Sequence, residues 1–286
     1  MKILVTGSSG FIGSNLIKAL LEKEYEVVGF SRSPSQLDIP FVVGDIRDTK
    51  KVRKICNDVD VIFHLATQKF VPEPLKDSMN HASVNILGTL NLLQESNCDF
   101  VYISSAEVYG EPDTIPVSEF APLRPKTPYA ISHVASEYYV RNLSERKGTN
   151  FTIFRLANIY GPNSDSVVSK FVERIKNNQN LLINGDGKAI RDLTNVKDVV
   201  DAFILSIRNK RMRNNVFNLG TGVKTSINKL ASLAIKLSGK HLKAVHQPAH
   251  DTEIKRLVLD ISKIKKTLRW RPKVTIEEGL RRMLFN

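Results

Sequence analysis

The chain of 286 residues contains little cysteine, only Cys56 and Cys98. Two thiols without metal-ligand spacing form neither a disulfide framework nor a zinc site. The sequence also lacks an apolar run near the roughly 20 residues that a transmembrane helix needs. Its first apolar segment ends at Gly7, which is too early for a signal sequence. We therefore expect a cytoplasmic protein with no membrane-bound segment and no bound metal.

Acidic residues are also in the minority, since 42 Lys and Arg against 29 Asp and Glu give a net charge of +13. A basic surface either binds a polyanion such as nucleic acid or steers a small anionic substrate. The basic residues are spread along the whole chain. The densest run, Arg208–Arg213, falls where a helix is expected to end, and cations stabilise that end of a helix. We therefore expect a small anionic substrate and no nucleic-acid partner.

The sequence does contain a glycine-spaced turn directly after its first apolar segment. Lys2–Thr6 is typical of a buried strand, and Ser14–Lys23 has helical spacing. Glycines between them let backbone N–H groups and the positive end of the helix dipole approach a pyrophosphate. An ordinary tight turn is the alternative. The spacing predicts a dinucleotide site at Gly7, Gly10, Phe11, Ile12 and Gly13.

Short apolar segments and helical periodicity then alternate along the chain. Further strands are expected at 26–31, 41–44, 59–66 and 100–104, and helices at about 75–95 and 129–147. This alternation predicts an α/β fold, a Rossmann-type doubly wound parallel sheet that binds ligands at the carboxyl ends of its strands.

The end of the second expected strand bears on the choice of cofactor. A free ribose 2′-hydroxyl is usually bound by a carboxylate there, but this chain has Ser31, Arg32 and Ser33. Hydroxyls and a guanidinium suit a 2′-phosphate. The sequence therefore favours NADP(H), with NAD(H) as second choice, and a solvent-facing arginine is the alternative for Arg32.

Several strand ends carry polar residues that can reach such a cofactor. Asp45 can accept from an adenine amino group, and Lys69 can reach a phosphate. Ser104 and Ser105 end the fifth strand, where we expect both hydroxyls to face the nicotinamide. Tyr129 and His133 lie four residues apart, so one helix face presents both to the same ligand.

Sequence motifs of one enzyme family continue through nearly the whole chain. They include T-G-x-x-G-F-I-G at 6–13, G-D-I-R-D at 44–48, H-L-A at 64–66, N-x-x-G-T-x-N-L-L at 85–93, S-S-x-E-V-Y-G at 104–110, R-L-x-N-I-Y-G-P at 155–162, G-D-G-x-x-x-R-D at 185–192 and N-L-G-T-G at 218–222. With these motifs the chain resembles an extended short-chain dehydrogenase/reductase of the NAD-dependent epimerase/dehydratase family.

The resemblance implies an enzyme that transiently oxidises a nucleoside-diphosphate sugar. It assigns the acid/base role to Tyr129 and a hydrogen bond to the reacting oxygen to Ser105. The family's 4,6-dehydratases carry Asp-Glu or Ser-Glu after that serine, whereas this chain has Ala106 and Glu107. Loss of the proton donor at 106 favours a 4-epimerase. An NADPH-dependent ketosugar reductase and, because Glu107 is kept, a 4,6-dehydratase are the alternatives.

His133 departs from the family pattern Tyr-x-x-x-Lys. The lysine binds the nicotinamide ribose and lowers the pKa of the tyrosine, whereas histidine is shorter and mostly neutral at pH 7. Two interpretations remain open. His133 orients the ribose in an active enzyme with altered pH dependence, or the chain is a catalytically weakened cofactor-binding protein.

The resemblance also implies further contacts, a domain division and an assembly. Cofactor contacts are expected from Ile46, Leu65, Ala66 and Asn85, and substrate contacts from Ser105, Asn158, Arg191 and His250. Residues 1–161, with a return at about 185–220, form the dinucleotide-binding domain, and 162–286 mainly form a smaller C-terminal α/β substrate lobe. Helices at 83–95 and 129–147 are expected to pair in a homodimer.

Overall fold

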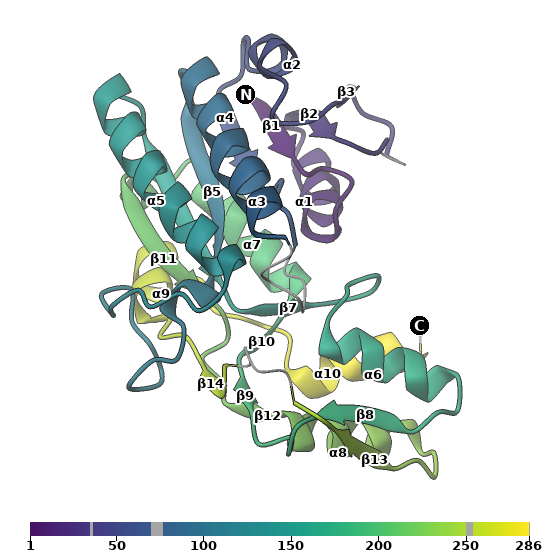
Figure 1. Cartoon of the computed structure of the whole chain (residues 1–286). Helices are drawn as coiled ribbons and strands as arrows, with labels where there is room; N and C mark the ends of the chain where they lie inside the picture. Colours follow the sequence, from purple (N-terminus) through teal and green to yellow (C-terminus); the bar gives the residue numbers. More distant parts are fainter. Residues whose placement is uncertain (35–36, 70–76, 250–253, 286) are drawn as a thin grey trace. The chain divides into compact units, whose positions relative to one another are not determined.

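The computed structural model describes residues 1–34, 37–69, 77–249 and 254–285 and divides into two compact units (Figure 1). Unit 1 comprises Met1–Gly110, Leu123–Arg155 and Val200–Phe217. Unit 2 comprises Glu111–Pro122, Leu156–Val199 and Asn218–Asn286. Among the described residues, no helix combines the length and the apolar character needed to cross a bilayer.

A seven-stranded sheet, with strand order β11-β6-β5-β4-β1-β2-β3, forms the centre of unit 1. Its strands are β1 (Lys2–Thr6), β2 (Glu26–Ser31), β3 (Phe41–Val43), β4 (Val61–His64), β5 (Asp99–Ser105), β6 (Phe151–Leu156) and β11 (Asn215–Leu219). The pairs β1–β2, β1–β4, β2–β3 and β4–β5 are parallel. The doubly wound α/β sheet predicted from the sequence is thus confirmed.

Helices cover both faces of this sheet, as the crossovers of a parallel sheet require. They are α1 (Phe11–Leu21), α2 (Thr49–Ile55), α3 (Ser78–His81), η1 (Ala82–Leu87), α4 (Gly88–Glu95), η2 (Ala106–Tyr109), α5 (Pro128–Lys147), α7 (Val196–Ser206) and η3 (Lys210–Met212). Figure 1 shows α4 and α5 running side by side, and both pack against each other.

The start of α5 is fixed by its sequence, and this sets the position of Tyr129. The Thr127 hydroxyl accepts a hydrogen bond from Ala130 N at 3.1 Å, and Pro128 occupies the first turn. Both features are typical of a helix N-terminus. The helix ends at Gly148, whose φ of 67° is left-handed.

The core of unit 1 combines an apolar cluster with a buried ion pair. Leu4, Phe30, Ile62 and Phe100 belong to a single cluster of buried side chains. Arg155 and Glu137 lie next to this core with side chains 2% exposed each, and Arg155 Nη2 is 2.6 Å from Glu137 Oε2. Two charges buried this deeply require such pairing.

Unit 2 contains short strands and four helices within the described residues. The strands are β7 (Asn158–Tyr160), β8 (Leu181–Asn184), β9 (Ile190–Arg191), β10 (Leu193–Asn195), β12 (Thr225–Ser226), β13 (Ala244–Gln247) and β14 (Arg256–Leu257). The helices are α6 (Val167–Lys176), α8 (Ile227–Ser238), α9 (Ser262–Leu268) and α10 (Ile276–Phe285). Phe171, Leu230 and Leu280 are among the side chains of its separate core.

Candidate active site

The glycine turn between β1 and α1 is tight enough to exclude side chains. Gly7 has a φ of +67°, and a Cβ placed there would lie 2.8 Å from Ala66 N. A Cβ at Gly13 would lie 2.3 Å from Gly7 O. The Ser8 hydroxyl in the same turn is buried without a hydrogen-bond partner. A backbone cradle at the start of an 11-residue helix, next to an orphaned hydroxyl, fits the pyrophosphate of a dinucleotide.

The carboxyl end of β2 carries hydroxyls and a cation. The Ser31 hydroxyl donates within this turn, to Ser9 Oγ at 2.8 Å or Ser33 O at 2.9 Å, and Arg32 is exposed. Asp45, which was expected to accept from an adenine, forms an ion pair with Arg47 at 2.7 Å. The Arg47 hydrogen bond lowers the pKa of Asp45, and Arg32 adds a smaller effect in the same direction.

The loop that follows β4 is held by Asn85. The Asn85 Oδ1 atom accepts from Gln68 N at 2.7 Å and from Thr67 Oγ1 at 3.0 Å, and its Nδ2 donates to Ser132 Oγ at 2.8 Å. The amide of Asn85 is therefore occupied by protein groups. In this structure it positions the loop that contains Leu65, Ala66 and the exposed Lys69.

Ile46 is a further predicted cofactor contact, and its side chain faces the interior. It is 5% exposed, and a Cβ added to Gly88 would lie 2.3 Å from Ile46 Cδ1. The side chain thus packs against the start of α4. Only the backbone of Ile46 is left to contact a ligand.

Ser105 and Tyr129 come together, as the sequence predicted. The Ser105 hydroxyl, at the carboxyl end of β5, lies near enough to the Tyr129 phenol, in the first turn of α5, to lower its pKa. Ser105 Oγ also accepts from Glu107 N at 3.2 Å. Burial and the nearby Glu107 carboxylate raise the pKa of the Tyr129 phenol, and Ser105 opposes them.

Ser104 differs from the expectation that both hydroxyls face the nicotinamide. Its Oγ donates to Glu137 Oε1 at 2.7 Å, and the residue is 3% exposed. Neighbouring side chains on a strand point to opposite faces, so only one of the two serines can face Tyr129. That residue is Ser105.

His133 is buried directly beside the predicted acid/base. Its ring lies edge to face with the Tyr129 ring, with centroids 4.6 Å apart. His133 Nδ1 is 2.8 Å from the Tyr102 hydroxyl, whereas its Nε2 is buried without a hydrogen-bond partner. Burial is the main cause that lowers the pKa of His133 to about 3, and the nearby His81 adds to it. The imidazole is therefore neutral at physiological pH.

Sequence reasoning missed three side chains around this pair, namely Tyr102, His81 and Ser136. The Tyr102 hydroxyl lies 2.8 Å from His133 Nδ1, Ser136 lowers the pKa of Tyr102 against the larger effect of burial, and the His81 ring lies 5.9 Å from the Tyr129 ring. A pattern for Tyr102 was present. It lies two residues before Ser104 on β5, so it faces α5 together with that serine.

The remaining predicted site residues belong to unit 2. Asn158 is exposed at the start of β7, and Arg191 is half-buried on β9, where its Nη1 donates to Ile190 O at 3.1 Å. His250 lies outside the described residues. Among the residues that the structure does describe, no three His, Cys, Asp or Glu side chains are grouped to hold a metal ion.

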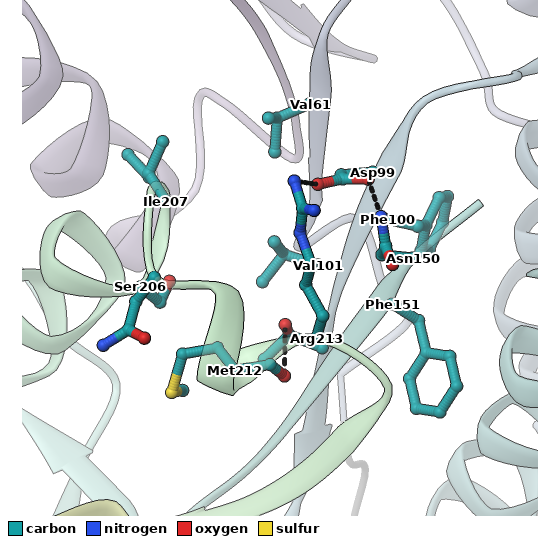
Figure 2. Close-up of a pocket in the computed structure, with 12 residues that line it drawn as sticks. Val61, Asp99, Phe100, Val101, Asn150, Phe151, Ser206, Ile207, Met212 and Arg213 are labelled. Atoms are coloured by element: carbon teal, nitrogen blue, oxygen red, sulfur yellow. Dashed lines mark hydrogen bonds and ion pairs between the residues drawn. The ribbon is translucent and has the colours of Figure 1, made fainter. Parts of the chain in front are cut away.

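A cavity at the amino ends of β4 and β5 lies at the opposite edge of the sheet from Ser105 (Figure 2). Its polar side chains bond to one another, since Asp99 accepts from Asn150 at 2.8 Å and from Arg213 at 3.2 Å. These pairs leave the cavity without a convergent set of groups for a ligand.

Comparison with known proteins places this geometry in a family. The family model of GDP-mannose 4,6 dehydratase matches residues 4–283. A putative UDP-glucose 4-epimerase of Methanocaldococcus jannaschii is 33% identical, over 99% of this chain and 97% of that protein.

Solved structures agree with the sequence relatives. A UDP-glucose 4-epimerase from Thermotoga maritima, determined with UDP-glucose, has a TM-score of 0.94 at 33% identity and covers 99% of this chain and 97% of its own. A UDP-glucose 4-epimerase from Thermus thermophilus, in complex with NAD, has a TM-score of 0.91 at 30% identity and covers 99% and 98%.

Proposed function

Since the chain belongs to the family of sugar-nucleotide epimerases and dehydratases whose model spans residues 4–283, we propose that it is a UDP-sugar 4-epimerase. It acts with a bound nicotinamide cofactor. The observation that supports the proposal is the nearness of the Ser105 hydroxyl to the Tyr129 phenol, whose pKa it lowers, at the strand edge where the glycine turn also ends. The names of the relatives supply the substrate class.

The roles of the residues follow from their chemistry. Tyr129 takes the proton of the sugar 4-hydroxyl and later returns it, and Ser105 holds the same oxygen by a hydrogen bond. The nicotinamide, when bound, supplies the reversible acceptor for hydride. Ala106 is buried and cannot protonate a leaving hydroxyl, so elimination of water lacks a donor at that position. Epimerisation needs no such donor.

For the cofactor we propose NADP(H) as the preferred form, with NAD(H) second. The described residues at the end of β2 present Ser31, Arg32 and Ser33 and no carboxylate. A planar guanidinium can hold a 2′-phosphate by two hydrogen bonds. The related epimerase solved with NAD favours the alternative. Measuring the dissociation constants of NADP(H) and NAD(H) tests this preference. Equal constants, or a smaller constant for NAD(H), would overturn it.

For the substrate we propose that Asn158 and Arg191 of unit 2 contact the diphosphate of the sugar nucleotide, and that unit 1 holds the dinucleotide. The planar cation of Arg191 suits a diphosphate, and an exposed amide at Asn158 can donate to it. Asn158→Ala and Arg191→Ala are expected to raise KM for the UDP-sugar while the cofactor dissociation constant stays the same.

We propose a homodimer formed through η1, α4 and α5. Large apolar side chains are exposed there, with Leu87 56%, Ile131 52% and Tyr138 64% accessible. Ile131 and Tyr138 are seven residues apart and so share one stripe of α5. Light scattering is expected to give the mass of two chains for the wild type and one for Tyr138→Glu. A monomeric wild type would refute this assembly.

A product assay tests the proposed activity. The purified protein is incubated with UDP-galactose and with UDP-glucuronic acid, and products are identified by proton NMR while absorbance is followed at 340 nm. We expect the 4-epimer to form with no net change in absorbance. Stoichiometric consumption of NADPH would indicate a ketosugar reductase, and a 4-keto-6-deoxy product a dehydratase.

One rival of another class is favoured by a specific observation. Since His133 is neutral and buried, it supplies no positive charge to Tyr129, and the chain is then a catalytically weakened cofactor-binding protein. Tight cofactor binding together with no product from any UDP-sugar would favour this rival over the epimerase.

A further inference from the structure

The buried ion pair of Glu137 and Arg155 makes hydrogen bonds beyond its own pairing. Arg155 donates to both carboxylate oxygens, from Nε to Oε1 at 2.9 Å and from Nη2 to Oε2 at 2.6 Å. Glu137 Oε1 also accepts from Ser104 Oγ at 2.7 Å. Arg155 Nη1 also donates to the Tyr109 hydroxyl at 2.9 Å. All four residues are 3% exposed or less, so the pair is the centre of a buried polar cluster.

The two additional hydrogen bonds hold the two ends of one short segment. Ser104 precedes Ser105 at the end of β5, and Tyr109 is the last residue of η2. The segment 104–109 is therefore bound to the same ion pair at its first and at its last residue. Within the segment, Glu107 N donates to Ser105 Oγ at 3.2 Å. Movement of either end would break a hydrogen bond that is shielded from water.

The ion pair also relates this segment to the helix that carries Tyr129. Glu137 lies eight residues after Tyr129 on α5, so the two side chains lie on the same face of the helix. Both β5 and η2 pack against this helix. The hydrogen bond from Ser104 to Glu137 thus fixes how far along α5 the end of β5 lies. It thereby fixes the place from which Ser105 presents its hydroxyl.

Stability alone does not explain a charged cluster at this place. Moving two charges out of water is unfavourable, and apolar side chains of the same volume often stabilise a fold at least as well as a buried ion pair. An arginine–carboxylate pair differs from apolar packing in its directionality, because each donor and acceptor requires a defined geometry. Such a pair can hold several bonded groups in one arrangement, and Ser105 directly follows one of the groups held here.

We propose that Glu137 and Arg155 are positioning residues of the candidate active site. Their ion pair anchors the segment 104–109 at Ser104 and at Tyr109 and so fixes the hydroxyl of Ser105. Both residues act through Ser105 and not on the reacting atoms. The effect on turnover rests on the proposed function, whereas the anchoring itself does not.

Two variants weaken the anchoring without leaving a buried charge unpaired. Glu137→Gln would leave the Arg155 cation without its counter-ion, which strongly destabilises a fold. Ser104→Ala is milder, because Arg155 still donates to both oxygens of Glu137 and one hydrogen bond is lost. Arg155→Lys keeps the positive charge but lacks the planar fork that reaches Glu137 and Tyr109 together.

Ser144→Ala is the matched control for these variants. Ser144 is buried on the same helix as Glu137. Within the described part of the chain, its hydroxyl has no hydrogen-bond partner. The control therefore removes a buried hydroxyl from α5 without touching the cluster.

Hydrogen exchange of the Glu107 amide, followed by NMR, measures the anchoring without any substrate. This amide donates to Ser105 Oγ inside the anchored segment. We expect Ser104→Ala and Arg155→Lys to speed its exchange by about twofold to tenfold, as the loss of one hydrogen bond predicts. Ser144→Ala should leave the exchange rate unchanged. A wild-type exchange rate in either of the two test variants would overturn the anchoring, even if UDP-sugars are converted.

Turnover tests whether the anchoring acts through Ser105. Ser104→Ala is expected to lower kcat by about twofold to tenfold while the cofactor dissociation constant stays the same. In a Ser105→Ala background the same change should have no further effect, because the hydroxyl that it positions is gone. An equal loss of kcat in both backgrounds would indicate a general structural effect and contradict the positioning role. If the wild type converts no UDP-sugar, the proposed function fails, and the exchange rates still decide whether the anchoring exists.

Discussion

The phenol of Tyr129 and the imidazole of His133 stand edge to face, with ring planes at 78° to each other. Neither ring stabilises the charged form of the other. Burial lowers the pKa of His133 to about 3, and burial also raises the pKa of Tyr129. The proposed acid/base therefore lacks the neighbouring cation that would bring its pKa toward the working pH.

Restoring that cation should change the pH dependence of the reaction. We expect His133→Lys to lower the pKa of Tyr129 and to shift the rise of kcat to lower pH, with about a tenfold gain at pH 7 for each unit of pKa shift. The measurement is the pH profile of UDP-sugar conversion. Combining this change with Tyr129→Phe serves as the control and should remain inactive. An unchanged pH dependence of kcat in His133→Lys would show that the activation of Tyr129 does not depend on residue 133.

Removing the phenolic oxygen should separate chemistry from binding. Tyr129→Phe is expected to reduce kcat by about 10²- to 10⁴-fold, since the proton of the sugar hydroxyl loses its acceptor, while cofactor affinity is kept. Ser105→Ala should cost less, because it removes an orienting hydrogen bond. Tyr139→Phe, an exposed change on the same helix, is the matched control. Wild-type kcat in Tyr129→Phe would refute the assignment.

Replacing different glycines of this turn should weaken cofactor binding by different amounts. A Cβ at Gly13 would lie 2.3 Å from Gly7 O, whereas one at Gly10 would lie 3.0 Å from the same atom. Gly13→Ala is therefore expected to displace the turn and to weaken cofactor binding by about 10- to 100-fold, with a smaller loss for Gly10→Ala. Fluorescence titration with NADP(H) measures both. Equal affinities in the two variants would mean that this turn does not hold the cofactor.

The buried histidines should make the fold sensitive to mild acid. Burial lowers the pKa of His64 and of His133 to about 3, against 6.5 for an exposed histidine. Below pH 6.5 both imidazoles are protonated in the unfolded chain but stay neutral in the folded one. Their contribution to the free energy of unfolding is therefore fully present above pH 6.5 and is lost as the pH falls toward 3. Each histidine contributes a slope of about 1.4 kcal/mol per pH unit in that window.

Urea unfolding at pH 7, 6 and 5 measures this slope. The lowered pKa values of Asp45 and Glu95 place their titration below this range, whereas burial raises the pKa of Glu119, whose protonation opposes the histidine slope near pH 5. His64→Gln is expected to reduce the slope relative to the wild type. A free energy of unfolding that is constant from pH 7 to 5 would contradict the burial of neutral imidazoles.

The regular part of unit 1 could be predicted closely from the sequence. The strands expected at 2–6 and 26–31 have those bounds in the structure, because a glycine or polar turn ends each apolar segment. The helix expected at 129–147 begins one residue earlier, at Pro128, since Thr127 caps it. The pairing of Ser105 with Tyr129 followed from motifs whose residues are far apart in the sequence.

Other features could not be predicted from the spacing of residues, because they depend on contacts between segments that are distant in the sequence. From Ser78 the helix expected at 75–95 continues to Glu95, but its middle part, Ala82–Leu87, is the π-helical turn η1. Ser104 carries the same hydroxyl as Ser105, and only the face of β5 decides that it bonds to Glu137. The partner of His133 is Tyr102, which lies 31 residues away, so their hydrogen bond needed the three-dimensional structure.

The π-helical turn Ala82–Leu87 holds one more residue per turn than an α-helix would. Asn85 lies within it, and its carbonyl accepts from both Thr89 and Ser136. Deleting one residue from this segment would let the helix close to its regular pitch and turn the Asn85 carbonyl away by about 100°. The register of that single helical insertion thus aims one carbonyl at two buried hydroxyls, one from the following turn and one from α5.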